Sequence, residues 1–154
     1  MDSFMQLDRF DIAILGELRT DARISWSALG EKVSLSAPAA QRRVQAMQRS
    51  GVIQYFTAIL DTRAMGAAVK AFIQVKIARH DQDAADQFRN TIALYEEVES
   101  CYQITGNMDF ILIVNARDIE SLGDFLENKI LYLPSVTDAI SSIVLRSLKE
   151  HGFI

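Results

Sequence analysis

Cysteine, histidine and proline are scarce in this chain. A single cysteine, Cys101, excludes an internal disulfide and cannot supply a zinc or iron–sulfur site alone. The two histidines, His80 and His151, are too far apart to have the spacing of metal ligands. Ser-His-Asp, Cys-His and phosphate-loop patterns are missing as well. We therefore expect no metal, no cofactor and no enzymatic activity.

Long apolar runs are also missing. The longest, such as residues 110–114, are far too short to span a bilayer, and the N-terminus carries acids where a secretion signal carries bases. We expect no membrane contact and a cytoplasmic location. With 154 residues, 49% hydrophobic and 23% charged, the chain has the composition of a soluble globular protein with one ordinary domain or two small ones.

The net charge of −4 is unevenly distributed along the chain. Residues 1–65 contain 8 Lys or Arg and 7 Asp or Glu, whereas residues 66–154 contain 8 and 13. From Lys32 to Leu60 there are four basic residues and no acidic residue. A polyanion is the natural partner of this acid-free stretch, and the acidity belongs to a separate module behind it.

The segment 35–53 is predicted to form a basic, one-sided helix. Ser36 can cap its N-terminus, Pro38 is tolerated in the first turn, and Gly51 supplies a left-handed residue at its end. An apolar stripe at helical spacing is formed by Ala40, Val44 and Met47. The opposite face carries Arg42, Gln45 and Arg49. Considered alone, the segment is compatible with a DNA-reading helix or with a merely solvated basic face.

Two shorter helices are predicted before the basic one. The first begins after Asp8 as N-cap, with Asp11 at its third position, and ends near Thr20. The second begins at Ser25 and ends near Ser34. Two short helices followed closely by a basic helix form the helix-turn-helix arrangement, in which the second helix of the pair enters the DNA major groove.

After the basic helix the pattern changes from helical to extended. Residues 52–61 are rich in β-branched and aromatic side chains, which predicts a strand. Residues 62–68 are predicted to be a turn or linker. We therefore divide the chain into a DNA-binding domain at 1–61, a linker at 62–68 and a second domain at 69–154.

The second domain alternates strands and helices in the order βαββαβ. Its strands are predicted at residues 69–79, 98–105, 109–116 and 136–148. Its helices are predicted at residues 83–94 and 119–131. This order predicts an α+β, ferredoxin-like fold with four antiparallel strands and two helices on one face.

The other face of that sheet is predicted to be apolar. It would carry Phe72, Ile104, Ile111, Ile113 and Ile143, more apolar surface than two helices on one side can hide. Association with another copy of the chain is the simplest cover.

Three segments resemble the Lrp/AsnC family of bacterial and archaeal regulators, the leucine-responsive or feast/famine proteins. Residues 7–23 (LDRFDIAILGELRTDAR) are similar to the family's first helix, residues 35–61 to its recognition helix and following strand, and residues 104–112 (ITGNMDFIL) to its Gly-x-x-Asp effector turn. The resemblance implies a winged-helix-like reader of double-stranded DNA joined to a ligand-sensing, ferredoxin-like domain. It also implies homodimers that assemble into tetramers or octamers. An amino acid bound between dimers would shift assembly or DNA affinity if it binds one assembly state better than another.

The resemblance extends to single residues near the basic helix. The DNA-contacting positions so predicted are Ser36, Ala37, Pro38, Ala39, Gln41, Arg42 and Arg43, with Gln45 on the same outward face. Gln41 and Arg42 are the candidates for base contacts, because Arg can clamp guanine and Gln adenine. Ser36 and Arg43 are expected at phosphates or in positioning roles, and Arg43 can instead brace the helix. Residues 37–39 would approach thymine methyls or simply begin the helix.

The effector site is predicted from the same resemblance. Its turn comprises Thr105, Gly106, Asn107, Met108 and Asp109. Gly106 would allow close backbone approach and Asp109 would accept a hydrogen bond from an ammonium group, although a plain hairpin turn is the alternative. On the last strand Ala139 and Ser141 complete the set where the family often has Thr-x-Thr. The lost hydroxyl leaves the ligand's identity open.

These features predict a sequence-specific DNA-binding transcription regulator whose assembly or DNA affinity responds to a small effector, an amino acid. An architectural protein that binds DNA without an effector is the alternative. A small enzyme built on the ferredoxin-like half is a third hypothesis, which lacks any catalytic constellation in the sequence.

Overall fold

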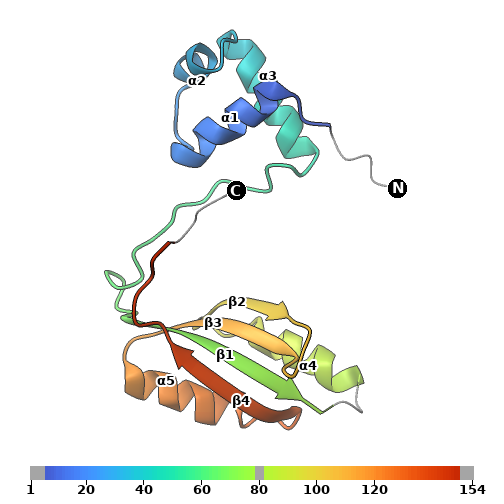
Figure 1. Cartoon of the computed structure of the whole chain (residues 1–154), viewed down its shortest axis with the longest axis vertical. Helices are drawn as coiled ribbons and strands as arrows, with labels where there is room; N and C mark the ends of the chain where they lie inside the picture. The colour runs from blue at the N-terminus through green and yellow to red at the C-terminus, as the bar shows by residue number, and fades with distance from the viewer. Residues whose placement is uncertain (1–5, 79–81, 150–154) are drawn as a thin grey trace. The chain divides into compact units, whose positions relative to one another are not determined.

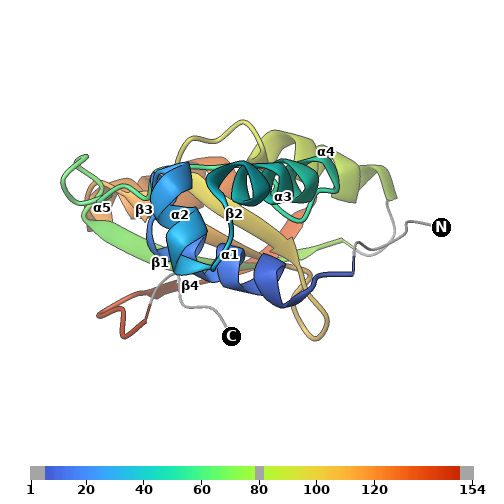
Figure 2. The ribbon, with the colours of Figure 1, turned by 90° about the horizontal axis from the view of Figure 1, so that it is seen from above.

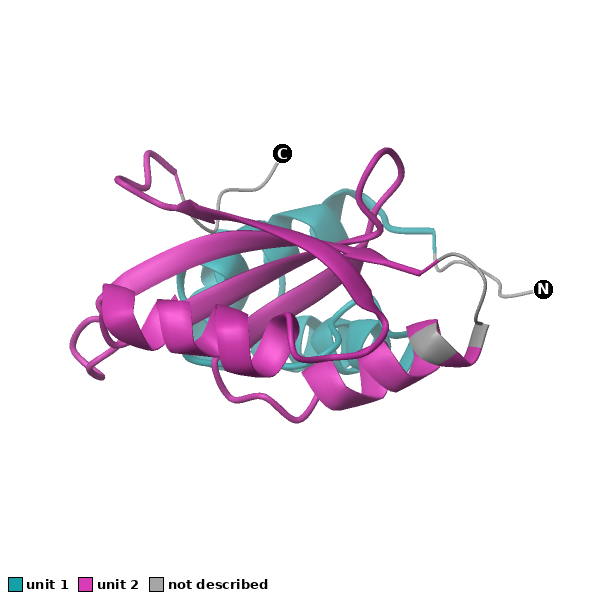
Figure 3. Cartoon of the chain, turned by 90° about the horizontal axis from the view of Figure 1, so that it is seen from below, with its two compact units in different colours: residues 1–59 teal, residues 60–154 magenta. Residues whose placement is uncertain are grey.

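The computed structural model of the chain describes residues 6–78 and 82–149. It divides into two compact units, residues 1–59 and residues 60–154, which are coloured separately in Figure 3. The boundary drawn from the sequence falls slightly later, after Asp61. The predicted end of the first strand at Arg79 and both histidines lie outside the described residues.

The first unit contains the three helices α1 (Arg9–Thr20), α2 (Trp26–Lys32) and α3 (Ala37–Arg49) (Figure 1). Each begins where the sequence predicts, because the side chains of Asp8, Ser25 and Ser36 accept hydrogen bonds from amides of the following turn. In α1 the capping is reciprocal, since the Asp11 carboxylate accepts from the Asp8 amide. The predicted caps are confirmed.

A small core joins these three helices. It is formed by Ile14, Leu18, Leu29, Val33, Ala40, Val44 and Met47, which include the whole predicted stripe of α3. Figure 2 shows α2 and α3 side by side. In the turn between them Ser34 has a φ of 58°, and the Leu35 amide donates to the Gly30 carbonyl at 2.8 Å. A Cβ on Gly30 would lie 2.6 Å from the Leu35 oxygen, so only glycine permits this approach.

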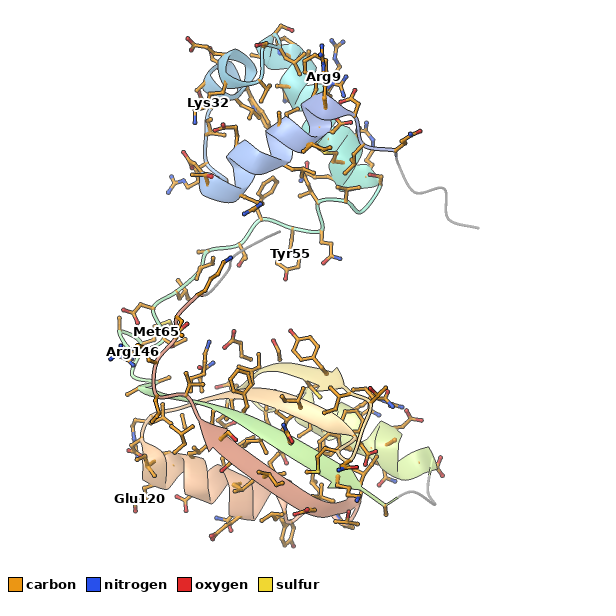
Figure 4. The ribbon with its side chains drawn as sticks, viewed as in Figure 1. Arg9, Lys32, Tyr55, Met65, Glu120 and Arg146 are labelled. Atoms are coloured by element: carbon orange, nitrogen blue, oxygen red, sulfur yellow. The ribbon has the colours of Figure 1, made fainter. Side chains whose placement is uncertain are left out.

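The stretch after α3 is not a strand. Gly51 has a φ of 77°, as predicted for the residue that ends the helix, but residues 52–61 have no regular secondary structure, so the predicted strand is wrong. A β-prone sequence forms a ladder only beside another strand, and no described residue pairs with this segment. Ile53 packs against the core of the first unit, but the other large apolar side chains of the segment are exposed; Tyr55, labelled in Figure 4, is 72% exposed.

The second unit contains a four-stranded antiparallel sheet in the order β2-β3-β1-β4. Its strands are β1 (Val69–Ile77), β2 (Val98–Gln103), β3 (Phe110–Ala116) and β4 (Val136–Ile143). Its helices are α4 (Gln82–Ile92) and α5 (Ile119–Phe125), which continues as the π-helix η1 (Leu126–Ile130). Both helices cover one face of the sheet (Figures 1 and 3). The predicted ferredoxin-like fold is confirmed.

The last strand is shorter than the predicted 136–148 and ends at Ile143. Its partner β1 begins at Val69, and the last backbone bond joins the Val144 amide to the Lys70 carbonyl. Beyond this point β1 offers no further backbone to pair with.

The covered face of the sheet holds the core of the second unit. It is formed by alternate residues of β1 and β3 with Phe88, Ile92, Leu122, Phe125 and Ile130 from the helical layer. Ile143 pairs with Ala71, which is buried in this core. Because directly opposed residues share a face, the prediction that Ile143 lies on the open face is wrong.

The open face is apolar, as predicted. Phe72 stands opposite Ile113 on β3 and Ser142 on β4, and Ile111 stands opposite Tyr102 on β2. Phe72 and Ile140 remain 38% and 52% exposed. Neither helix of the second unit lies on this side (Figure 3).

Candidate nucleic-acid interface and effector turn

The outer face of α3 presents the predicted DNA-reading side chains. Arg42 and Gln45 are exposed, Gln41 is half-buried, and Val44 on the opposite side is buried in the core. Among the described residues Arg42 has no ion-pair partner. The outer face of α3 therefore offers one cation, Arg42, and two amide side chains, Gln41 and Gln45. No acidic residue lies near them in the sequence.

The first turn of α3 shows how its small residues are used. The Ser36 hydroxyl accepts a hydrogen bond from the Ala39 amide at 3.4 Å, and Pro38 occupies the first turn, where its missing N–H is not needed. Ala37 and Ala39 are half-buried and Pro38 is exposed. This geometry fits helix-start chemistry, and contact of residues 37–39 with DNA stays a prediction.

Arg43 is bound within the first unit. Its Nη1 lies 2.9 Å from Oδ2 of Asp8 and 2.8 Å from Oδ1 of Asp11, and the guanidinium lies 5.4 Å from the centre of the Phe10 ring. The Asp11 and Asp8 carboxylates raise the pKa of Arg43. The Asp11 amide, followed by the Arg43 guanidinium, lowers the pKa of Asp8. The bracing alternative for Arg43 is therefore present in the structure.

The ion-pair partners of Arg43 are not evident from the sequence. Their spacing predicts only that Asp8 and Asp11 cap α1, and Asp11 lies 32 residues before Arg43. One available signal was the second acid of the capping box. A carboxylate at the third helical position that becomes buried needs a compensating cation.

The predicted effector turn connects β2 and β3. Gly106 has a φ of 119°, a conformation that side-chain-bearing residues rarely adopt, and space around it is open. Thr105 and Asn107 are exposed, whereas Met108 is buried. The Asp109 amide donates to the Val75 carbonyl, and its Oδ2 accepts from the Ile77 amide, both at 2.9 Å. The turn is thus anchored to β1 through Asp109.

The two predicted effector residues on β4 lie across β1 from this turn. Ala139 pairs with Val75, the residue whose carbonyl binds the Asp109 amide, so Ala139 and Asp109 flank the same point of β1. Ser141 pairs with Ile73, farther along the strand, and is exposed. The sheet brings the turn and Ala139 to one end and leaves Ser141 more distant.

Other sites have weaker chemical features. Burial raises the pKa of the Cys101 thiol, an effect that Arg89 partly opposes, so the thiolate is disfavoured. Within residues 6–78 and 82–149, no group of three or more His, Cys, Asp or Glu could hold a metal ion. No helix in that part of the chain is long and apolar enough to cross a membrane.

Comparison with known proteins assigns both units. Residues 7–48 match the AsnC-type helix-turn-helix domain, and residues 70–154 match the Lrp/AsnC ligand binding domain. The chain belongs to the Lrp/AsnC family. It is 32% identical over 144 residues to the leucine-responsive regulatory proteins of Escherichia coli strain K12 and Klebsiella pneumoniae, which covers 94% of this chain and 88% of each relative.

Solved structures of Lrp/AsnC regulators have the same fold. A transcriptional regulator from Neisseria meningitidis, crystallised as a complex with L-Met, has a TM-score of 0.90 and 32% identity, with 94% of each chain covered. An AsnC family regulator from Agrobacterium tumefaciens has a TM-score of 0.87 and 28% identity, again with 94% of each chain covered. The predicted family and fold are confirmed. This Lrp/AsnC protein is a transcriptional regulator with a DNA-binding helix-turn-helix domain and a ligand-binding domain, and its relatives are regulators rather than enzymes.

Proposed function

We propose that this regulator reads specific sites on double-stranded DNA with α3 in the cytoplasm, and that an amino acid bound to its second unit shifts its assembly or DNA affinity. One observation carries the DNA-reading part. The face of α3 opposite its buried stripe presents exposed Arg42 and Gln45 within an acid-free stretch. A helix fixed on one side and cationic on the other suits the major groove.

The proposed DNA contacts of α3 fall into two groups, according to the chemistry of the side chains. Gln41 and Arg42 read base edges, since a guanidinium can bind guanine and an amide adenine through paired hydrogen bonds. Gln45 lies one turn after Gln41 and extends the same reading edge. Ser36 and residues 37–39, at the start of α3, approach the phosphate backbone or thymine methyls.

The amino-acid effector is supported by the turn at residues 105–109. Its left-handed Gly106 leaves the backbone open, and Asp109 uses Oδ2 for the Ile77 amide, which leaves Oδ1 to accept from an ammonium group. The similar regulator from Neisseria meningitidis was crystallised with L-Met. Ala139 stands where the family often has a hydroxyl, so the preferred amino acid can differ from those of relatives.

Self-association is supported by the open face of the sheet. Phe72, Tyr102 and Ile140 are exposed there, beside the half-buried Ile111 and Ile113. A contiguous apolar sheet face is stabilised by burial against another copy, which gives a homodimer. Further assembly into tetramers or octamers would create pockets between subunits.

The test measures fluorescence anisotropy with a labelled duplex from the regulator's own promoter region and with an unrelated duplex. We expect tighter binding to the first duplex and a change in affinity with at least one amino acid. Light scattering on the same samples should then show a change in particle mass. Equal affinity for both duplexes would contradict sequence-specific reading. If no amino acid changes affinity, mass or melting temperature, the effector role fails and the architectural alternative gains.

A further inference from the structure

The cluster formed by Asp8, Asp11 and Arg43, here called the clamp, joins the start of α1 to the middle of α3. Asp11 is only 2% exposed, and both of its carboxylate oxygens are used: Oδ2 accepts from the Asp8 amide and Oδ1 from Arg43. A second carboxylate, that of Asp8, contacts the same Nη1 of Arg43. The Phe10 ring lies beside the guanidinium. One guanidinium thus contacts two acids from another helix.

We propose that Arg43 is a positioning residue and not a DNA contact: the clamp fixes the rotation of α3 about its axis, and so holds Gln41 and Arg42 in register with the bases. This inference rests on the proposed function of α3. Arg43 then affects sequence specificity indirectly, by placing Gln41 and Arg42.

The packing of α3 explains why a clamp is needed. Hydrophobic contact through Ala40, Val44 and Met47 is non-directional, so a narrow apolar stripe tolerates small rolling movements of the helix. Hydrogen bonds from a planar guanidinium to carboxylates are directional. Arg43 is adjacent to Arg42 in α3. A rotation of the helix that moves Arg43 therefore also moves the side chains of Gln41 and Arg42.

The charges of the clamp argue against a phosphate contact. Two carboxylates face one guanidinium, so the cluster carries a net negative charge and repels a phosphate. If Arg43 turned toward DNA, the buried Asp11 carboxylate would lose its cation, which is strongly unfavourable. Arg43 therefore stays in the clamp when DNA is bound.

The decisive variant is Asp8→Asn, because a positioning role and a phosphate contact of Arg43 predict different results for it. Asparagine also caps helices well, so α1 keeps its start. If Arg43 positions α3, loosening the clamp lowers the ratio of specific to non-specific affinity by about tenfold, comparable to loss of one base contact. If Arg43 contacts phosphate, releasing it from Asp8 and removing one negative charge raises affinity for both duplexes and leaves their ratio unchanged. Asp21→Asn is the matched control, because Asp21 is exposed and, among the described residues, its side chain bonds only to the Arg23 amide.

Two substitutions of Arg43 complete the test. Arg43→Lys keeps the charge but replaces the rigid, flat guanidinium beside Phe10 with a flexible, strongly hydrated ammonium, so we expect the direction of α3 to be held less firmly and the affinity ratio to fall as in Asp8→Asn. Arg43→Met should leave the slope of log affinity against log salt for the unrelated duplex unchanged, whereas loss of a phosphate contact would reduce its magnitude by about 0.9.

A reduced salt slope in Arg43→Met, or an unchanged affinity ratio in both Asp8→Asn and Arg43→Lys, would overturn the clamp. Circular dichroism of each variant identifies any that fails to fold, and the two milder variants then decide. Failure of the proposed function is distinguishable, because the unsubstituted protein would then bind both duplexes equally.

Discussion

The Asp109 carboxylate accepts a hydrogen bond from the backbone amide of Ile77 at 2.9 Å. Ile77 lies where the pairing of β1 with β4 shifts register, after Lys76, and a register shift leaves backbone groups without a ladder partner. Asp109, in the turn directly before β3, supplies an acceptor for this amide. The residue that we propose as an effector contact therefore also has a structural role, and the two roles need separate tests.

We expect Asp109→Ala to lower the free energy of unfolding by about 1–3 kcal/mol, because the Ile77 amide loses its acceptor in a largely buried position. Asp109→Asn keeps an oxygen acceptor and should cost less, while removing the charge that would bind an ammonium group. Urea unfolding followed by circular dichroism measures the first effect, and amino-acid-induced melting shifts measure the second. An alanine variant as stable as the parent would show that Ile77 finds another acceptor.

Gly30→Ala should destabilise the first unit by about 1–3 kcal/mol, because the added Cβ would lie 2.6 Å from a backbone oxygen and the turn would have to move. Gly16→Ala is its matched control. Apart from its chain neighbours and the backbone of its own helix, no described atom lies within 4 Å of a Cβ there, so the substitution should stabilise α1 by about 0.5–1 kcal/mol. Trp26, the only tryptophan, reports unfolding of this unit by fluorescence. Equal effects of the two substitutions would contradict the close approach at Gly30.

Ser34→Gly should stabilise the first unit by about 0.5–1 kcal/mol. Serine at a φ of 58° carries the steric strain of left-handed backbone, which glycine avoids, although glycine also gains freedom in the unfolded chain. Ser27→Gly, inside α2, should instead destabilise by up to about 1 kcal/mol. The same Trp26 fluorescence assay compares the signs, and destabilisation by both would contradict the strain at Ser34.

Acid should lower the stability of the folded second unit, partly because Asp118 becomes protonated. The Ser121 hydroxyl and amide, with Arg117, lower the pKa of this N-cap carboxyl from 3.8 to about 2. Because the pKa is lower in the folded state, the stabilisation is fully present above the unfolded value and is lost as the pH falls toward 2. We expect the urea midpoint of Asp118→Asn to fall less between pH 4 and pH 2 than that of the parent. Parallel pH profiles would contradict this contribution.

Arg42→Ala should weaken specific DNA binding by about 1–3 kcal/mol and relax the preference at one operator position. The reason is that a base-edge contact discriminates among sequences, whereas a phosphate contact does not. Anisotropy with duplexes substituted at each position measures both effects. An equal loss on every duplex would make Arg42 a phosphate contact.

Local signals predicted the helices well. The caps at Asp8, Ser25 and Ser36 and the left-handed Gly51 depend on side chains within one turn of the helix end, so the sequence contains everything needed to locate them. The order of strands and helices in the second unit followed from periodicity in the same way.

Features set by distant residues were not predictable. The segment 52–61 has a strand-forming composition but no described partner, and pairing is a property of two segments. The face of Ile143 depends on its register with Ala71, which alternation along one strand does not reveal. Two acids near the start of the chain hold Arg43, and only the packing of α1 on α3 brings them together.

The π-helical turn at the end of α5 also has a consequence for comparison with relatives. In η1 the Leu131 amide donates to the Leu126 carbonyl, five residues back, so this turn contains one residue more than an α-helical turn. The added residue lets Ile130 reach the core while Lys129 lies over the Tyr95 ring. A relative whose helix remains α-helical here would align with a gap of a single residue inside the helix, where gaps are ordinarily avoided.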